Sequence, residues 1–357
     1  NSNSKLKVQS SKPGMKSRVA LIKGNDRHDN IAQALDLIES DIDLSDKKHI
    51  LIKPNFVSTR RHLAATHVDA VRAVLDWLRP RYDGHITIGE GAATSDTFDG
   101  YRNFGYLDPS GRASGRSLAE EYDVRFVDLN RDEWMPVQVY GRRLRPMAVR
   151  VARTTLESDF RISIGPPKTH DAVIVTLSLK NMVVGSLING RGGGFVQKLG
   201  QLLPDRLTNL ALAERVKSHL STVNRSDKFA LHQGYHGLNL NLYRLAKFIA
   251  PHLSVIDGFV GMEGAGPSHG DPVYLRVALA STDFLAADVI ATRLMGFDPD
   301  EVGYLYYCKL GDLGAGDLKD IEIVGNATIE ECARKFRPHS TYEQQLGWQM
   351  PEVEKFL

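Results

Sequence analysis

Cysteine is scarce in this sequence, which has two in 357 residues, Cys308 and Cys332, and no CxxC pair. Cysteine-bound zinc sites and ferredoxin-type iron–sulfur clusters need several cysteines at close, regular spacing. We therefore expect neither kind of centre here. Cys308 and Cys332 are expected to be reduced, partly buried thiols that pack as small apolar side chains.

Long apolar runs are also absent. A helix that spans a bilayer needs about 20 predominantly apolar residues, and no stretch of this chain approaches that length. Residues 1–16 are polar and lack the apolar core of a signal peptide, so they are expected to form a flexible tail. These patterns predict a cytoplasmic protein with no membrane partner, unless a signal segment has been removed from its N-terminus.

Neither sign of charge is in excess, because 45 Lys and Arg residues face 43 Asp and Glu residues, for a formal net charge of +2. Nucleic-acid-binding proteins usually carry a clear basic surplus, so no nucleic-acid partner is expected. No GxGxxG fingerprint follows a predicted strand and no GxxxxGK[ST] is present, which gives nucleotide binding no support. A GxSxG hydrolase motif is absent as well.

What the sequence does contain is a repeated alternation of short apolar runs with helical patterns. Strands are predicted at 17–24, 49–56, 85–91, 123–129, 161–167, 253–261, 277–281 and 321–325. Helices are predicted at 30–42, after a cap at Thr66, at 208–220, at 238–250, and at 283–295 with a cap near Ser281 or Thr282. Strands that are apolar throughout are typical of a mostly parallel sheet with helices on both faces, the α/β class.

The length favours two intimately joined lobes rather than one core. We predict an N-terminal α/β lobe over 17–150, a second α/β lobe over 151–330 that completes a crevice, and a C-terminal extension over 331–357. Gly190, Gly192, Gly193 and Gly194 predict a mobile loop over 189–207.

Polar residues directly follow four of the predicted strands: Lys53-Pro54-Asn55, Gly89-Glu90-Gly91, Pro167-Lys168-Thr169-His170 and Asp257-Gly258. In open α/β sheets, ligands bind beyond the carboxyl ends of the strands. We therefore expect these side chains to meet at one edge of the sheet and to form a ligand site there.

Several segments, in this order, resemble domain-of-unknown-function family 362 over roughly residues 18–325. They are KPNFV (53–57), THVDAVRAVL (66–75), IGEG (88–91), SDFRISIGPPKTH (158–170), TLSLKNMVVG (176–185), VIDGFVGMEGAGPSHGDP (255–272) and STDFLAADVIATRLMGFDP (281–299). The resemblance implies an α/β fold with a pocket, without fixing a reaction. Many members carry a cysteine-rich ferredoxin-like segment, which this chain lacks. The order of strand, polar turn, helix and IGEG strand is also similar, at the level of the fold, to the nickel-pincer lactate racemases, which act on 2-hydroxy acids.

Lys168, His170 and Lys180 are the first candidates for a site. Lysine can hold a carboxylate or phosphate, and histidine can transfer a proton or bind a metal. The alternative for Lys168 and His170 is a solvated lysine and a hydrogen-bonded loop histidine. Lys180 lies within the apolar segment SLKNMVV, where a bare ammonium is costly. Its structural alternative is an ion pair with Asp257 or Asp288.

Lys53, Asn55 and Asn181 are predicted to bind substrate beside Lys180, and Glu90 is predicted to assist His170 and Lys168 in catalysis. Asn55 has a simpler alternative, since an Asx-type turn explains an asparagine after a strand.

His67, His236 and Asp257 are candidate ligands for a divalent metal such as iron, nickel, zinc or manganese. His232 and His236 are spaced i, i+4, which would place both rings on one face of a helix, but Gly234 and Gly237 weaken that helix. A plain surface position also explains His67.

These residues favour an enzyme that acts on a small carboxylate or phosphorylated metabolite by His/Lys acid–base chemistry, with or without a metal. Isomerase, racemase or lyase chemistry is preferred over an iron oxygenase. The alternative is a non-catalytic binding or accessory protein for an anionic ligand or a metallocofactor. The sequence does not indicate an oligomeric state.

Overall fold

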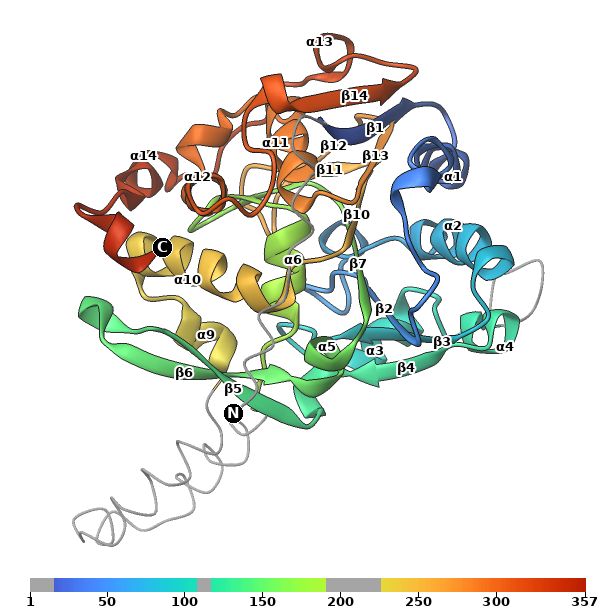
Figure 1. Ribbon diagram of the computed structural model, residues 1–357, viewed down its shortest axis with the longest axis horizontal. Coiled ribbons are helices and arrows are strands. Elements are labelled where there is room, and N and C mark those ends of the chain that lie inside the picture. The colour runs from blue at the N-terminus through green and yellow to red at the C-terminus, as the bar shows by residue number, and fades with distance from the viewer. Residues whose placement is uncertain (1–15, 108–116, 191–225) are drawn as a thin grey trace, which may run out of the picture.

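The computed structural model describes residues 16–107, 117–190 and 226–357, and its central feature is an eight-stranded sheet (Figure 1). The strands run in the order β14 (Ile321–Gly325), β1 (Ser17–Lys23), β13 (Val277–Ser281), β10 (Leu253–Gly258), β7 (Phe160–Gly165), β2 (His49–Lys53), β3 (His85–Glu90) and β4 (Arg125–Asp128). Every neighbouring pair is parallel except the two that involve β13. The other seven strands therefore deliver their carboxyl ends to one edge of the sheet.

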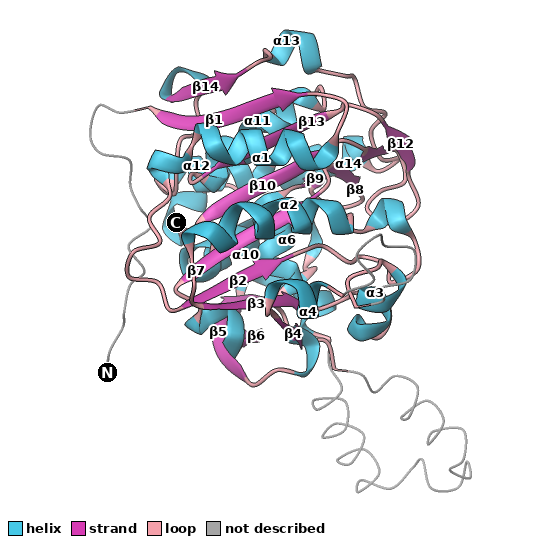
Figure 2. Ribbon diagram, turned by 90° about the vertical axis from the view of Figure 1, so that its right-hand side faces the viewer, coloured by secondary structure: helices cyan, strands magenta, loops and turns pink. Residues whose placement is uncertain are grey.

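Helices cover both faces of this sheet. α1 (Arg27–Leu37) and α2 (Val68–Leu78) lie on the face that is turned to the viewer in Figure 2. The opposite face carries α6 (Ser178–Gly185), α10 (Gly234–Ile249), α11 (Phe284–Leu294) and α12 (Gly303–Leu310) (Figure 1).

Alternate side chains of each strand enter different cores. Val19 and Leu21 of β1 pack with the α10 and α11 side, whereas Ala20 and Ile22 pack with α1 and α2. This period of two, with both sides apolar, is why the strands read as continuous apolar runs. The α/β prediction with helices on both faces is confirmed.

The remaining elements extend this frame. They are the hairpin β5 (Trp134–Tyr140) and β6 (Pro146–Ala152), the small sheet of β12 (Asp271–Val273), β11 (Gly261–Glu263), β8 (Lys168–His170) and β9 (Ile174–Thr176), the short helices α3 (Thr97–Asn103), α4 (Leu118–Tyr122), α5 (Arg153–Glu157), α9 (Asp227–Leu231), α13 (Ile329–Cys332) and α14 (Tyr342–Gln345), and the 3₁₀ turn η2 (His62–Ala64). No helix in the described ranges is long and apolar enough to cross a membrane.

All eight predicted strands are present, with ends shifted by a few residues. The predicted helix 208–220, residues 191–207 of the predicted glycine-rich loop, and residues 1–15 of the predicted tail lie outside the described residues. The large sheet combines strands from both predicted lobes, since β7, β10, β13 and β14 share it with β1 to β4. The division into lobes stays a prediction.

Two predicted helix caps are wrong. The ring nitrogen Nδ1 of His67, not Thr66, accepts the backbone N–H of Asp69 at the start of α2, 3.2 Å away. Thr66 is buried between strand ends, where its hydroxyl accepts the N–H of Asn55 at 2.8 Å and donates to the carbonyl of Ile164 at 2.9 Å. Asp283, rather than Ser281 or Thr282, caps α11.

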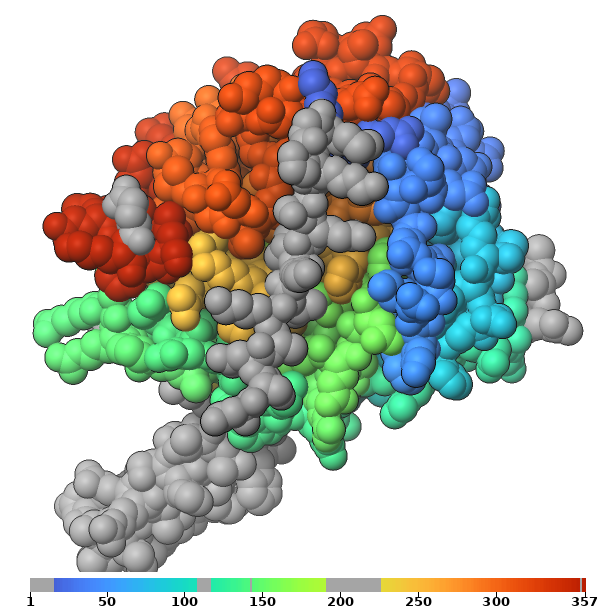
Figure 3. Space-filling model, in the orientation of Figure 1, coloured from blue at the N-terminus to red at the C-terminus, as the bar shows by residue number. Residues whose placement is uncertain are grey.

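The C-terminal segment, residues 331–357, packs on the outer helices. Trp348 is buried, and its indole N–H donates to the carbonyl of Glu301 at 2.6 Å. In Figure 3 this segment, in dark red, lies against the yellow and orange surface formed by the chain from α10 onward. It also reaches the β8–β9 hairpin through Gln345.

Candidate functional site

Four buried lysines converge near the carboxyl edge of the large sheet, and we call them the lysine cluster. Lys53 ends β2, Lys168 begins β8, Lys180 lies in α6 and Lys228 lies in α9. None is more than 5% exposed. Lysine is almost never fully buried without a partner, so four in one place point to a specific purpose.

The buried ammonium group of Lys53 has three polar partners. Its ammonium forms an ion pair with Glu90 and donates to the carbonyl of Pro54 and to Oδ1 of Asn181, both at 2.9 Å. The two strands that carry Lys53 and Glu90 are neighbours in parallel register, which brings both ends to the same point. Gly185 in α6 lies so close that a Cβ there would overlap the end of the Lys53 side chain.

Asn55 and Asn181 connect Lys53 to Lys168. Lys168 donates to Oδ1 of Asn55 and, at 3.3 Å, to the carbonyl of Ala64. The amide nitrogen of Asn55 donates to Oδ1 of Asn181 at 3.1 Å. One continuous network of buried polar groups thus joins β2, β8 and α6.

Lys228 completes the cluster and was not among the site residues predicted from the sequence. Its ammonium donates to the carbonyls of Gly91 at 2.8 Å and Val184 at 2.9 Å. Neither acceptor carries a formal charge. The available signal was a lysine next to the apolar triplet Phe-Ala-Leu at 229–231, the same kind of signal that drew attention to Lys180.

Lys180 is different, because its ammonium makes no hydrogen bond or ion pair with the residues that the structure describes. Its structural alternative, an ion pair with Asp257 or Asp288, is wrong. Asp257 pairs with Arg27. Asp288 accepts the backbone N–H groups of Ser178 and Leu179 and so caps α6.

A cavity of about 40 Å³ lies beside these groups. Its lining residues are Asn55, Phe56, Val57, Glu90, Gly91, Ala93, Thr176, Lys180, Asn181, Val184, Gly185 and Lys228. A water molecule needs roughly 10–15 Å³ of such space, so the cavity has room for a few waters or for one small polyatomic ion.

The electrostatics of the cluster favour an anion. Among the described residues, only Lys53 of the four lysines forms an ion pair with a carboxylate, that of Glu90, while the negative charges of Asp171 and Asp128 act on Lys180 and Lys228 without such a contact. Burial lowers the pKa of Lys168 to about 7, with the charge of Lys180 as the next cause. Burial also lowers the pKa of Lys228 to about 7 and that of Lys180 to about 8, and it lowers the pKa of Lys53 against the opposing effect of Glu90. A bound anion would offset both the desolvation and the mutual repulsion.

His170 lies at the edge of the cluster and does not line the cavity. Burial, followed by the charge of Lys180, lowers the pKa of His170 to about 3, so its ring is neutral at pH 7. Its Nδ1 accepts the backbone N–H of Ala172 at 3.0 Å. The ring stacks on that of His232, with centroids 6.5 Å apart.

Of the predicted metal ligands, His67 and Asp257 share one pocket, whereas His236 lies elsewhere. His67 and Asp257 line a separate pocket on the α1 and α2 side. His236 lies in the first turn of α10, where Nδ1 is 2.9 Å from the carbonyl of Trp348. His232 and His236 do not share a helix, because the chain turns at Gly234, with φ of +79°, between α9 and α10.

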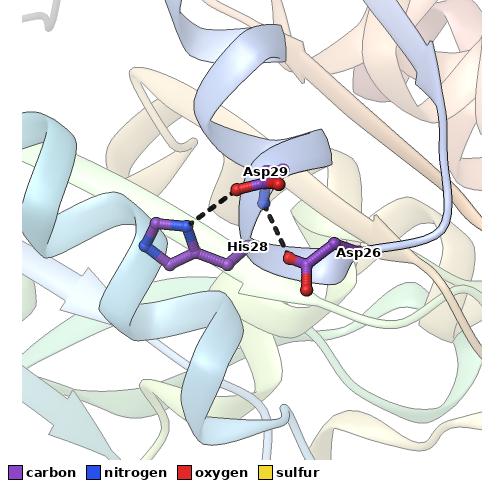
Figure 4. A group of neighbouring side chains, drawn as sticks. All are labelled: Asp26, His28 and Asp29. Carbon is purple, nitrogen blue, oxygen red and sulfur yellow. Dashed lines mark hydrogen bonds and ion pairs between the residues drawn. The ribbon is translucent and has the colours of Figure 1, made fainter.

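Asp26, His28 and Asp29 form a different group, at the start of α1 (Figure 4). It is the one set of three or more His, Cys, Asp or Glu residues in the described ranges whose ligand atoms lie within 4.8 Å of one another. Asp26 caps the helix by accepting the N–H of Asp29, and His28 pairs with Asp76 at 2.8 Å. Helix capping and a surface ion pair account for this group without a metal.

Residues 50–293 match the protein family described as "Domain of unknown function (DUF362)". The chain belongs to this family. The matched range includes every member of the lysine cluster together with Glu90, Asn55 and Asn181, so the resemblance on sequence motifs is confirmed.

One curated protein and one solved structure are similar to parts of this chain. The chain is 23% identical over 252 residues to the thylakoid-associated protein sll1697 of Synechocystis sp., a match that covers 70% of this chain and 64% of that protein. Among solved structures, the lactate racemase apoprotein of Thermoanaerobacterium thermosaccharolyticum superposes with a TM-score of 0.42 at 13% identity, over 79% of this chain and 57% of that one.

Proposed function

We propose that the lysine cluster binds a small anion, a carboxylate or a phosphate group, and that the protein is an enzyme that transfers a proton to or from this ligand. The observation that carries the proposal is the charge imbalance. Only one of the four buried lysines, Lys53, is ion-paired with a carboxylate, and Lys180 borders the cavity without a hydrogen bond or an ion pair to any described residue. Burying unpaired positive charge is costly unless a ligand of opposite charge compensates it.

The roles follow from the bonds. Lys53 is held by Glu90 and Asn181. Its role is therefore to hold these two side chains in position rather than to transfer a proton. Lys180 contacts the anion directly. Lys228, which lines the cavity and has a pKa of about 7, exchanges the proton, since a group with a pKa near the working pH is the most effective general acid or base. Lys168 does not line the cavity and holds Asn55, which does.

His170 takes a smaller role in this proposal than the sequence predicted. A ring with a pKa of about 3 is a poor base at pH 7, and its Nδ1 is already engaged with a backbone N–H. We assign His170 to positioning the β8–β9 hairpin that carries Lys168.

A bare divalent metal does not fit the lysine cluster, because four buried lysines, of which only Lys53 is ion-paired, repel a cation. The alternative function is that of a non-catalytic binding protein for a small anion. The low pKa values of Lys168 and Lys228 favour the enzyme, since a binder gains nothing from lysines that lose their charge near pH 7.

Binding and catalysis can be tested separately. Binding is measured as the rise in melting temperature with inorganic phosphate, glycolate or lactate, for the wild type and for Lys180→Met. Catalysis is measured by NMR in D₂O as exchange of the α-hydrogen of the carboxylates, for the wild type and for Lys228→Met. Exposed Lys335→Met is the matched control. Binding without exchange would select the alternative function, and an absence of binding would refute the anion site.

A further inference from the structure

A second pocket, of about 300 Å³, lies near the starts of α1 and α2. Its lining includes the polar residues Arg27, His67 and Asp257 and the apolar or aromatic residues Leu63, Val260 and Tyr274. None of its lining residues belongs to the lysine cluster or lines the smaller cavity. We call it the Arg27 pocket.

The guanidinium of Arg27 is anchored on one side only. Its Nε lies 3.1 and 3.0 Å from the two carboxylate oxygens of Asp257, which is buried at the end of β10. The guanidinium of Arg27 lies over the ring of Phe259, with 4.9 Å between Cζ of Arg27 and the ring centroid. The two Nη groups have no acceptor among the described residues, and the side chain is 16% exposed. Arg27 therefore presents a fixed pair of donors to the pocket.

His67 supplies another donor. Because its Nδ1 accepts the backbone N–H of Asp69 at 3.2 Å, the neutral ring carries its proton on Nε2. Leu63 and Val260 add apolar surface to the lining, and Tyr274, which is 64% exposed, also lines the pocket. A large exposed aromatic ring beside fixed polar donors is typical of a small-molecule site.

We propose that the Arg27 pocket binds an organic carboxylate with a compact apolar body. Two free Nη groups in one plane match the two oxygens of a carboxylate. The nearby charge of Asp257 offsets that of Arg27, which favours a monoanion over a dianionic phosphate. The apolar part of the ligand packs on Leu63, Val260 and Tyr274. This site is independent of the function proposed for the lysine cluster, whose cavity of about 40 Å³ is too small for such a molecule.

The test uses 3-phenylpropanoate as a probe, with the uncharged 3-phenylpropanamide for comparison. Binding to the whole chain is followed by saturation-transfer NMR and isothermal titration. Arg27→Lys keeps a positive charge beside Asp257 and removes the pair of Nη donors. The affinity for 3-phenylpropanoate should therefore fall by about tenfold, as expected for the loss of a charge-assisted bidentate contact. Val260→Trp, which fills the pocket, should remove binding of the acid.

Three results would overturn the proposal. They are an absence of saturation transfer to 3-phenylpropanoate, equal binding of the acid and the amide, and loss of binding in Lys180→Met with none in Arg27→Lys. The last result would place the probe in the lysine cluster instead. Circular dichroism checks that each variant is folded. If Arg27→Lys does not fold, loss of binding of the acid in Val260→Trp supports the proposal and unchanged binding refutes it.

Discussion

Lys53 and Glu90 form an ion pair that is shielded from solvent, with Lys53 fully buried and Glu90 1% exposed. The pair joins the ends of neighbouring strands β2 and β3, and Asn181 from α6 completes the coordination of the ammonium at 2.9 Å. A buried pair of this kind contributes little net stability, yet breaking it leaves an uncompensated charge. The Lys53–Glu90 ion pair therefore fixes the positions of these two side chains within the lysine cluster.

Glu90→Gln should lower the free energy of unfolding by about 3–5 kcal/mol, the usual cost of removing one partner of a buried ion pair. The double variant Lys53→Met/Glu90→Gln should recover most of that loss, because the charge left behind is removed too. Urea denaturation measures both. Glu322→Gln, on an exposed residue, is the control and should change stability by less than about 0.5 kcal/mol. If the double variant is no more stable than Glu90→Gln, the pairing is not the source of the cost.

Gly185→Ala should destabilise the protein and disturb the site. The added methyl would overlap the end of the Lys53 side chain and lie 3.2 Å from a Glu90 oxygen, so the ion pair must shift. Overpacking of this kind costs about 1–3 kcal/mol. Gly347→Ala is the matched control, since nothing lies within 4 Å of a Cβ there. Thermal denaturation compares them, and equal melting temperatures would mean that Lys53 is not tightly constrained.

The ligand-free protein should become more stable as the pH rises from about 7 to 9. The folded pKa values of Lys168 and Lys228 are about 7 and that of Lys180 is about 8, all below the usual 10.5. In this window the unfolded chain binds more protons than the folded chain, so the free energy of unfolding increases with pH. Buried Asp288, whose pKa is about 7, acts mainly below the window. Urea denaturation at several pH values measures the slope.

The double variant Lys168→Met/Lys180→Met should flatten this slope, since two of the three lysines no longer titrate. Glycolate should bind more weakly as the pH rises, because the lysines lose their charge while the carboxylate stays fully ionised. An unchanged slope in the double variant would assign the pH dependence to other groups.

Lys180→Met should weaken anion binding by about 10- to 100-fold, which corresponds to the loss of one charge-assisted hydrogen bond. It should also raise the pKa of Lys168 and of His170, because the charge of Lys180 is a cause of lowering in both. NMR titration of the His170 ring and isothermal titration with phosphate provide the two readouts. Lys335→Met should affect neither. Unaltered affinity in Lys180→Met would remove this residue from the site.

Gln345 should prove necessary for the site although it lies in the C-terminal segment. Its side chain accepts the backbone N–H of Ile174 and donates to the carbonyl of His170 at 2.9 Å, so it bridges the β8–β9 turn. Ile174 has φ of +64°, a strained value for a β-branched residue that persists only when the surroundings enforce it. Gln345→Leu should therefore weaken anion binding and lower stability by about 1–3 kcal/mol.

Adding Ile174→Gly tests the cause, because glycine adopts positive φ without strain. It should restore the affinity of Gln345→Leu for phosphate more than its stability, since the turn keeps its shape while apolar packing is lost. If Ile174→Gly restores no binding, the role of Gln345 is not to hold the strained turn.

The sequence by itself determined the layers of the fold and much of the site. Apolar strands that alternate with amphipathic helices predict a parallel sheet covered by helices. Parallel strands bring their carboxyl ends to the same edge of that sheet. That rule placed Lys53, Asn55 and Glu90 correctly at one edge. The desolvation cost of an ammonium group also marked Lys180 within its apolar segment.

Only the tertiary structure decided which of these groups meet. Lys228 reaches the cluster from a distant short helix, and His67 and Asp257 line a separate pocket near the starts of α1 and α2. Sequence spacing reports positions along one element, whereas the partners of Asp288 and Gln345 lie more than a hundred residues away along the chain. The charge balance of a buried site depends on those distant partners, so the unpartnered state of Lys180 could be found only once the chain was folded.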